Sequence, residues 1–90
     1  MSYSILVHTA ANKDLARLDN NIYERVSKRI DELQTNPRPY DCKKLEGKNN
    51  YRIRIGDFRV VYKILDKEKI VEILSVLNRR EAYKKKYKRR

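Results

Sequence analysis

Three arginines lie within eight consecutive residues of this chain, at Arg52, Arg54 and Arg59. The surrounding segment, residues 50–64, is NYRIRIGDFRVVYKI, in which apolar and polar residues alternate. A glycine-containing dipeptide at 56–57 separates the two halves, and this pattern predicts a β-hairpin with a two-residue loop. Because side chains alternate between the faces of a strand, the three arginines then share one face. A guanidinium presents a planar fork of donors that matches a phosphate, so this face is a candidate phosphate-binding surface.

The predicted register also sets which side chains oppose each other across the hairpin. Arg54 lies opposite Arg59, and two like charges directly opposed weaken a sheet. A polyanion that binds there explains this pair better than an ordinary exposed strand, which tends to pair opposite charges. Arg52 and Arg54 can also be simply the polar half of an amphipathic strand. The other face of the hairpin is apolar and is expected to be core: Tyr51, Ile53, Ile55, Phe58, Val60 and Tyr62.

The composition indicates one small, basic domain that spans residues 1–90. Hydrophobic residues make up 40% and charged residues 39% of the chain, and the formal net charge is +11. Such an excess opposes compaction, so it indicates an acidic partner: RNA, DNA, an anionic membrane or an acidic protein. No run reaches the roughly 18 apolar residues of a membrane span, and the first residues lack a secretory signal. The single cysteine, Cys42, fits a reducing cytosol.

Hydrophobic periodicity predicts an α+β fold. Thr9 is expected to cap a first helix, and residues 19–21 to cap a second, whose apolar residues recur every three or four positions. The expected helices are 10–18, 22–33 and 79–87, and the expected strands are 3–8, 51–55, 58–62 and 70–77, with a candidate short strand at 43–45. The order β-α-α-β-β-β-α gives a small, mainly antiparallel sheet with an N-terminal helical hairpin on one face and a short C-terminal helix.

The excess charge concentrates at the C-terminus. Residues 79–90, RREAYKKKYKRR, hold eight basic residues and one acid. The spacing of Tyr83 and Tyr87 favours the short terminal helix. From about Lys84 onward, the basic tail 84–90 can equally be a solvated arm.

Most catalytic chemistries are missing from the residue inventory. His8 is the single histidine and no Cys/His cluster occurs, so a zinc site is not expected. No set of acids suggests a magnesium site, and no glycine-rich phosphate loop is present. Ser75 has no histidine base, and Cys42 is expected to be inert despite its lysine neighbours. We therefore expect no metal and no cofactor.

Arginine, lysine and tyrosine remain, and they suit the self-cleavage of RNA. In that reaction the 2′-hydroxyl attacks the neighbouring phosphorus, and fixed cations stabilise the charge that develops on the phosphoryl oxygens. The hairpin arginines and Arg79 can form such a cage without a metal. Tyr83 can stack on a base or exchange a proton, although it can also be a helix anchor. DNA lacks the 2′-hydroxyl, so this route is closed to it.

These motifs resemble the RelE/ParE toxin superfamily, in particular the RelE-type messenger RNA endonucleases. The resemblance spans essentially the whole chain and rests on KLEG at 44–47, YRIR at 51–54, GDFRVVY at 56–62 and RREAY at 79–83. It implies a cytoplasmic toxin that binds the ribosomal A site and cuts the messenger by 2′-hydroxyl attack, without metal. It also implies a cognate acidic antitoxin, similar to RelB, that neutralises the toxin and represses the operon jointly with it, so that operator DNA is bound only through the antitoxin.

The resemblance assigns roles to individual residues. Arg52 and Arg54 match the phosphate contact and the candidate general base, where the best-known relatives have lysines, and Arg59 matches the arginine that stabilises the transition state. Arg79 matches one implicated in protonating the leaving group, and Tyr83 the tyrosine that stacks on or orients the nucleotide. Arginine stays protonated, so Arg54 is a poor base; another group or water takes the proton, or catalysis is mostly electrostatic. Further RNA contacts are expected from Lys44, Lys48, Arg80, Lys84 and Lys85.

Two other functions stay open at this point. ParE-type relatives share the fold but inhibit DNA gyrase and lack the full basic and tyrosine set, so the presence of that set favours the nuclease. A non-catalytic RNA-binding domain would use the same basic face and tail, with an affinity that falls steeply with salt.

Overall fold

The computed structural model describes residues 2–46 and 49–78, and within them it forms two helices and one five-stranded sheet. The elements in chain order are β1 (Ser4–Val7), α1 (Thr9–Ala16), α2 (Asn20–Glu32), β2 (Lys43–Lys44), β3 (Asn50–Ile55), β4 (Phe58–Leu65) and β5 (Ile70–Asn78). The helix predicted at 79–87 and the basic tail lie outside the described residues. Neither described helix has the length and apolar character needed to cross a membrane.

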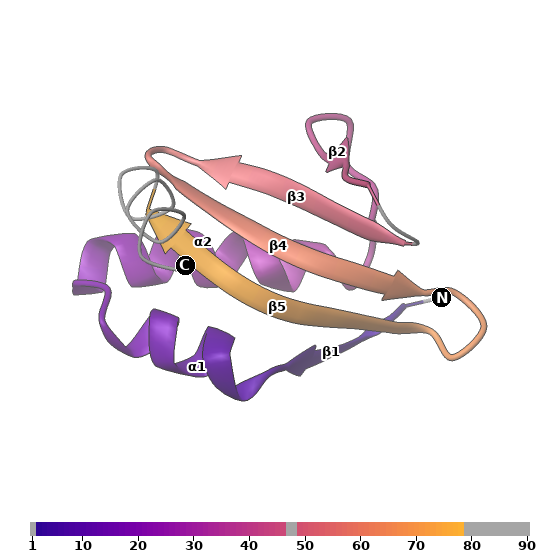
Figure 1. The fold of residues 1–90 in the computed structure, drawn as a ribbon, viewed down its shortest axis with the longest axis horizontal. Coiled ribbons are helices and arrows are strands. Elements are labelled where there is room, and N and C mark those ends of the chain that lie inside the picture. Colours follow the sequence, from indigo (N-terminus) through magenta and orange to yellow (C-terminus); the bar gives the residue numbers. More distant parts are fainter. Residues whose placement is uncertain (1, 47–48, 79–90) are drawn as a thin grey trace.

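The strands are ordered β1-β5-β4-β3-β2, and only the β1–β5 pair within this sheet is parallel. The predicted α+β fold with a mainly antiparallel sheet is therefore confirmed, and β5 is the interior strand that its apolar run indicated. Both helices lie on the same side of the sheet, as Figure 1 shows, and leave the other face open.

The helix starts follow local hydrogen bonding. Asp19 caps α2 as predicted, because its carboxylate accepts from the backbone N–H of Ile22 at 3.2 Å. The predicted cap at Thr9 is wrong: Thr9 is the first residue of α1 and His8 is the N-cap. The backbone N–H of His8 still donates to the Ile73 carbonyl at 3.0 Å, so the chain turns directly from the sheet edge into the helix.

The core is a single layer between the helices and the inner face of the sheet. Tyr62 is fully buried, its ring stacks on that of Tyr51 with centroids 5.9 Å apart, and its hydroxyl donates to the Pro37 carbonyl at 2.8 Å. Burial raises the pKa of the Tyr62 hydroxyl, so it keeps the proton that it donates. The other buried side chains are Ala11, Val26, Ile30, Leu33, Ile53, Ile55, Val60, Ile64, Val71, Ile73 and Val76.

One carboxylate ties three distant segments together at the end of the sheet opposite the β3–β4 turn. Asp66, in the β4–β5 turn, accepts from the Tyr3 hydroxyl at 2.7 Å and from Nη2 of Arg38 at 2.8 Å. Arg38 also donates from Nε to the Tyr51 hydroxyl at 3.2 Å. The connector after α2 is thereby fastened to the chain start, to the β4–β5 turn and to β3.

Replacement of Tyr62 by phenylalanine tests the buried hydrogen bond. Tyr62→Phe leaves the Pro37 carbonyl without its donor, so we expect the free energy of unfolding to fall by about 1–3 kcal/mol. Urea denaturation measures this. The control Tyr40→Phe changes a fully exposed ring and should leave stability unaltered; equal losses in both variants would refute the assignment.

The Asp66 cluster predicts a pH dependence. Hydrogen bonds from Arg38 and then Tyr3 lower the pKa of Asp66. A lowered folded pKa stabilises the protein above the ordinary carboxyl value, about 3.9, and this contribution is lost as the pH falls through the folded pKa. Urea titrations at successive pH values should show a smaller acid loss for Asp66→Asn than for the parent. Glu68→Gln, in the same turn, should follow the parent curve.

Candidate nucleic-acid interface

The β3–β4 hairpin has the register predicted from its turn. Arg54 pairs with Arg59, Arg52 with Val61 and Tyr51 with Tyr62. The turn is possible because Gly56 adopts a left-handed conformation, φ 61°, which glycine tolerates without a Cβ penalty.

The two faces of the hairpin separate as the alternation requires. Ile53 and Val60 are fully buried beneath the helices. Arg54 is exposed, and Arg52 and Arg59 are half-buried on the opposite, open face of the sheet. The three arginines therefore belong to one face of the sheet, and no helix of the described residues covers that face (Figure 1).

The three arginines influence one another electrostatically. The pKa of Arg52 is lowered by burial first, and then by the positive charges of Arg59 and Arg54. No carboxylate of the described residues forms an ion pair with any of the three, whereas Arg29 pairs with Asp41 at 3.0 Å. Their charge is therefore available to an external anion.

A hollow of about 320 Å³ lies beside two of these arginines. Its lining residues are Asp41, Lys43, Arg52 and Arg54. Both oxygens of Asp41 already accept from Arg29 at 3.0 Å, so the carboxylate does little to offset the three cations. The hollow has the charge and the open shape that a phosphodiester requires.

The short strand β2 places its two lysines in different surroundings. β2 pairs Lys43 with Arg52 and Lys44 with Tyr51, and directly paired residues share a face. Lys43 thus joins the arginine face, while Nζ of Lys44 lies 5.9 Å from the centroid of the Tyr51 ring. Lys44 is exposed but does not share the arginine face, and its role as an RNA contact stays a prediction. Lys43 was missed because the register of the short β2 pairing is not visible in the sequence.

The remaining predicted site residues cannot be compared with this geometry. They lie outside the described residues: Lys48, Arg79, Arg80, Tyr83, Lys84 and Lys85. Their roles stay predictions. Within the described ranges, no three His, Cys, Asp or Glu side chains gather as metal ligands would.

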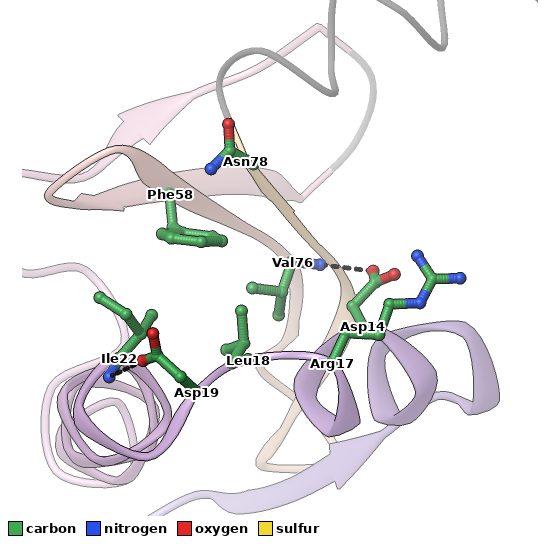
Figure 2. Close-up of a pocket in the computed structure, with 8 residues that line it drawn as sticks. All are labelled: Asp14, Arg17, Leu18, Asp19, Ile22, Phe58, Val76 and Asn78. Carbon is green, nitrogen blue, oxygen red and sulfur yellow. Dashed lines mark hydrogen bonds between the residues drawn. The ribbon is translucent and has the colours of Figure 1, made fainter.

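A separate hollow of about 260 Å³ lies between the helical hairpin and the ends of β4 and β5. Figure 2 shows Asp14 pointing to β5, where its Oδ2 accepts from the Val76 N–H at 2.9 Å, and Asp19 directed to Ile22. Both acids thus satisfy backbone donors. Arg17 is the one cation among the residues that line this hollow, and it stands beside two acids. The hollow therefore does not gather the positive charge of a phosphate site.

Comparison with known proteins agrees with this fold. Residues 5–83 match the family model described as ParE toxin of the type II toxin–antitoxin system ParDE. A candidate toxin named RelE1 in Methanocaldococcus jannaschii is 36% identical over 88 residues, which cover 93% of this chain and 98% of that protein.

Solved structures of toxin–antitoxin complexes are also similar. The archaeal RelE–RelB complex of Pyrococcus horikoshii gives a TM-score of 0.80 at 35% identity, covering 88% of this chain and 97% of that one. The RelBE2 complex of Mycobacterium tuberculosis gives 0.77 at 28% identity, with 88% and 100% covered.

The opposed arginine pair predicts a gain of stability on mutation. Arg59→Thr removes the repulsion with Arg54 and introduces a good strand former, so the free energy of unfolding should rise by about 0.2–1 kcal/mol. The gain should shrink at high salt, which screens the repulsion. Denaturation at two salt concentrations measures both effects.

The matched control is Lys63→Thr on the same strand. Lys63 pairs with Asn50 and Glu72 and meets no opposed cation, so this change should bring no gain. A similar gain at both positions would show that threonine propensity, rather than relief of repulsion, is responsible.

Proposed function

Since this chain belongs to the ParE/RelE family of toxins from type II toxin–antitoxin systems, we propose that it is an endoribonuclease that cuts messenger RNA on the ribosome. Cleavage inhibits translation in the cytoplasm, and a cognate antitoxin neutralises the toxin. The proposal is carried by one observation: Arg52, Arg54 and Arg59 lie together on an open face without carboxylate partners among the described residues.

The reaction that suits this cluster is an internal transesterification. The 2′-oxygen of one nucleotide forms a bond to the adjacent phosphorus, the bond from phosphorus to the 5′-oxygen breaks, and a proton passes from the 2′-hydroxyl to solvent or a base while the leaving oxygen gains one. Negative charge accumulates on the phosphoryl oxygens in the transition state. Guanidinium groups fixed around that position lower the barrier because they need no reorganisation.

Each residue has a distinct part in this proposal. Arg52 and Arg54 hold the scissile phosphate, and Arg59 stabilises the developing charge. Arg79 stabilises the leaving 5′-oxygen by a hydrogen bond while water supplies its proton, since arginine does not give its own proton up. Tyr83 stacks on or orients the nucleotide. Arg54 remains charged at any working pH and does not act as the base, so the cluster works mainly by electrostatics.

The shallow form of the site supports presentation of the message by the ribosome. The hollow beside Arg52 and Arg54 is open and lined by charged side chains. Such a surface grips a phosphate but does not by itself set the in-line geometry of attack, and correct alignment is a large part of the barrier. A messenger already held in the ribosomal A site meets this requirement.

The proposed protein partner is an acidic antitoxin similar to RelB. The RelE chain of Pyrococcus horikoshii and the RelBE2 protein of Mycobacterium tuberculosis were solved as toxin–antitoxin complexes. For this chain, a net charge of +11 favours an acidic partner. The pair would bind operator DNA through the antitoxin.

A second candidate is a ParE-type gyrase inhibitor, because the matching family model is described as ParE. In that case the hairpin arginines would serve protein contacts rather than RNA cleavage. DNA damage after induced expression, with the messenger intact, would favour this candidate.

Arg59→Ala is the direct test of the nuclease. We expect a loss of cleavage of about 10²–10³-fold, the usual effect of removing one fixed donor to an oxyanion. The assay maps messenger ends in a cell-free translation mixture. Because Arg59 is outside the core, circular dichroism should show an unchanged fold.

The control is Lys67→Ala, an exposed cation in the β4–β5 turn. It removes the same charge and should cut as the parent does. Undiminished cleavage by Arg59→Ala would contradict the proposed mechanism, and RNA binding without any cleaved product from the parent would leave a non-catalytic RNA-binding domain.

A further inference from the structure

A second cationic hollow lies where α2 passes the β3–β4 turn. Its volume is about 380 Å³. The charged side chains that line it are Arg25, Lys28, Arg29, Glu32 and Arg54. It adjoins the hollow that contains Lys43 and Arg52, since Arg54 lines both.

The sequence of α2 explains how this hollow forms. Positions 25, 28, 29 and 32 are three and four residues apart, so they make one stripe along the helix. This stripe runs beside the apolar one that includes Val26 and Ile30, which is buried against the sheet. Packing of the apolar stripe therefore brings the charged stripe alongside the hairpin turn. A Cβ added to Gly56 would lie 3.5 Å from Nη2 of Arg25, so the two residues are close neighbours.

The charges around the hollow do not cancel. Arg29 forms ion pairs with Asp41 at 3.0 Å and Glu32 at 3.4 Å, so these two acids are already engaged. Arg25, Lys28 and Arg54 have no ion pair within the part of the chain that the structure describes. Three exposed cations around one concavity repel each other, and an anion bound between them relieves that repulsion.

We propose that this hollow is a second phosphate-binding site, which holds a backbone phosphate of the RNA outside the reacting pair of nucleotides. The substrate class rests on the proposed function. β2 pairs only with residues 51–52, so no strand within the described ranges pairs with the rest of the outer edge of β3. An RNA strand bound at Arg52 and Arg59 can pass Arg54 at this edge. Its next phosphate then reaches Arg25 and Lys28.

The lining favours nucleic acid over a folded peptide. Protein interfaces depend on large apolar side chains in pockets, and the exposed large apolar residues of the described ranges line neither cationic hollow: Leu6, Tyr23 and Tyr40. A phosphate backbone needs only charge and hydrogen-bond donors, which these two hollows supply.

The test uses the double variant Arg25→Gln, Lys28→Gln in the full chain. Glutamine keeps the helix propensity of arginine and lysine. The probe is a fluorescent 2′-O-methyl RNA of about 12 nucleotides, which cannot undergo 2′-hydroxyl attack, and anisotropy gives its affinity between about 50 and 200 mM salt. Each phosphate neutralised on a single strand contributes about 0.7 to the salt slope, so loss of this one phosphate contact should lower the slope by about 0.7.

The matched control is Lys13→Gln, Lys67→Gln. It removes the same charge from exposed positions on α1 and in the β4–β5 turn, at the opposite end of β4, and should keep the parent slope. Equal slopes for the two double variants would overturn the proposal. If the double variant of α2 is unfolded by circular dichroism, Lys28→Gln alone should lower the slope by a part of this value of about 0.7, and no change there would overturn the proposal.

Two further arms separate this proposal from its alternatives. If the double variant lost affinity for polyglutamate but bound RNA as the parent does, the hollow would belong to an acidic protein partner, and the proposal would be overturned. In the cleavage assay, the double variant should raise KM and leave kcat unchanged. The anisotropy probe cannot be cut, so it reports binding independently of cleavage. If Arg59→Ala still cleaved the messenger, the proposed nuclease mechanism would fail, whereas the second phosphate site would still be judged by the salt slope.

Discussion

The pairing of β3 with β4 across a two-residue turn is the constraint on which the rest of the structure depends. A slip of one residue would exchange the two faces and place Ile53 in solvent and Arg54 in the core. The left-handed Gly56 fixes the turn, and the buried Ile53 and Val60 fix the face. The packing of the helices and the arrangement of the arginine cluster are therefore two results of one register.

The register also has a cost, because it sets Arg54 against Arg59. A fold selected only for stability would place an acid or a neutral residue at one of these positions. The core on the other face offsets the repulsion, with Tyr62, Ile53 and Val60 fully buried directly beneath the cluster. The repulsion between Arg54 and Arg59 thus remains in the folded sheet, where a bound polyanion would relieve it.

The arginines of the described residues fall into two groups by their partners. Arg29 and Arg38 pair with carboxylates and hold the connector after α2 in place. The hairpin arginines have no such partners, and Arg25 on α2 resembles them in this respect. Asp41, the acid that lines the hollow beside Arg52, is engaged by Arg29, so the positive charge of the arginines is left open to a ligand.

Sequence alone determined the hairpin and its faces, because a two-residue glycine loop and strict alternation leave little freedom in the register. It also determined the interior position of β5 and the Asp19 cap, which depend on short-range patterns. The N-cap of α1 was placed at Thr9 instead of His8, because His8 is held by Ile73, a contact that no local pattern encodes.

Tertiary structure decided the parts of the surface that join distant segments. The placement of Lys43 on the arginine face follows from a two-residue strand pairing, and the meeting of Arg25 and Lys28 with Arg54 follows from how α2 packs. Arg25 and Lys28 are about thirty positions away from Arg54 in the chain. The periodicity of each element fixes its own faces, whereas the neighbour of each face is set only when the apolar stripes are buried together.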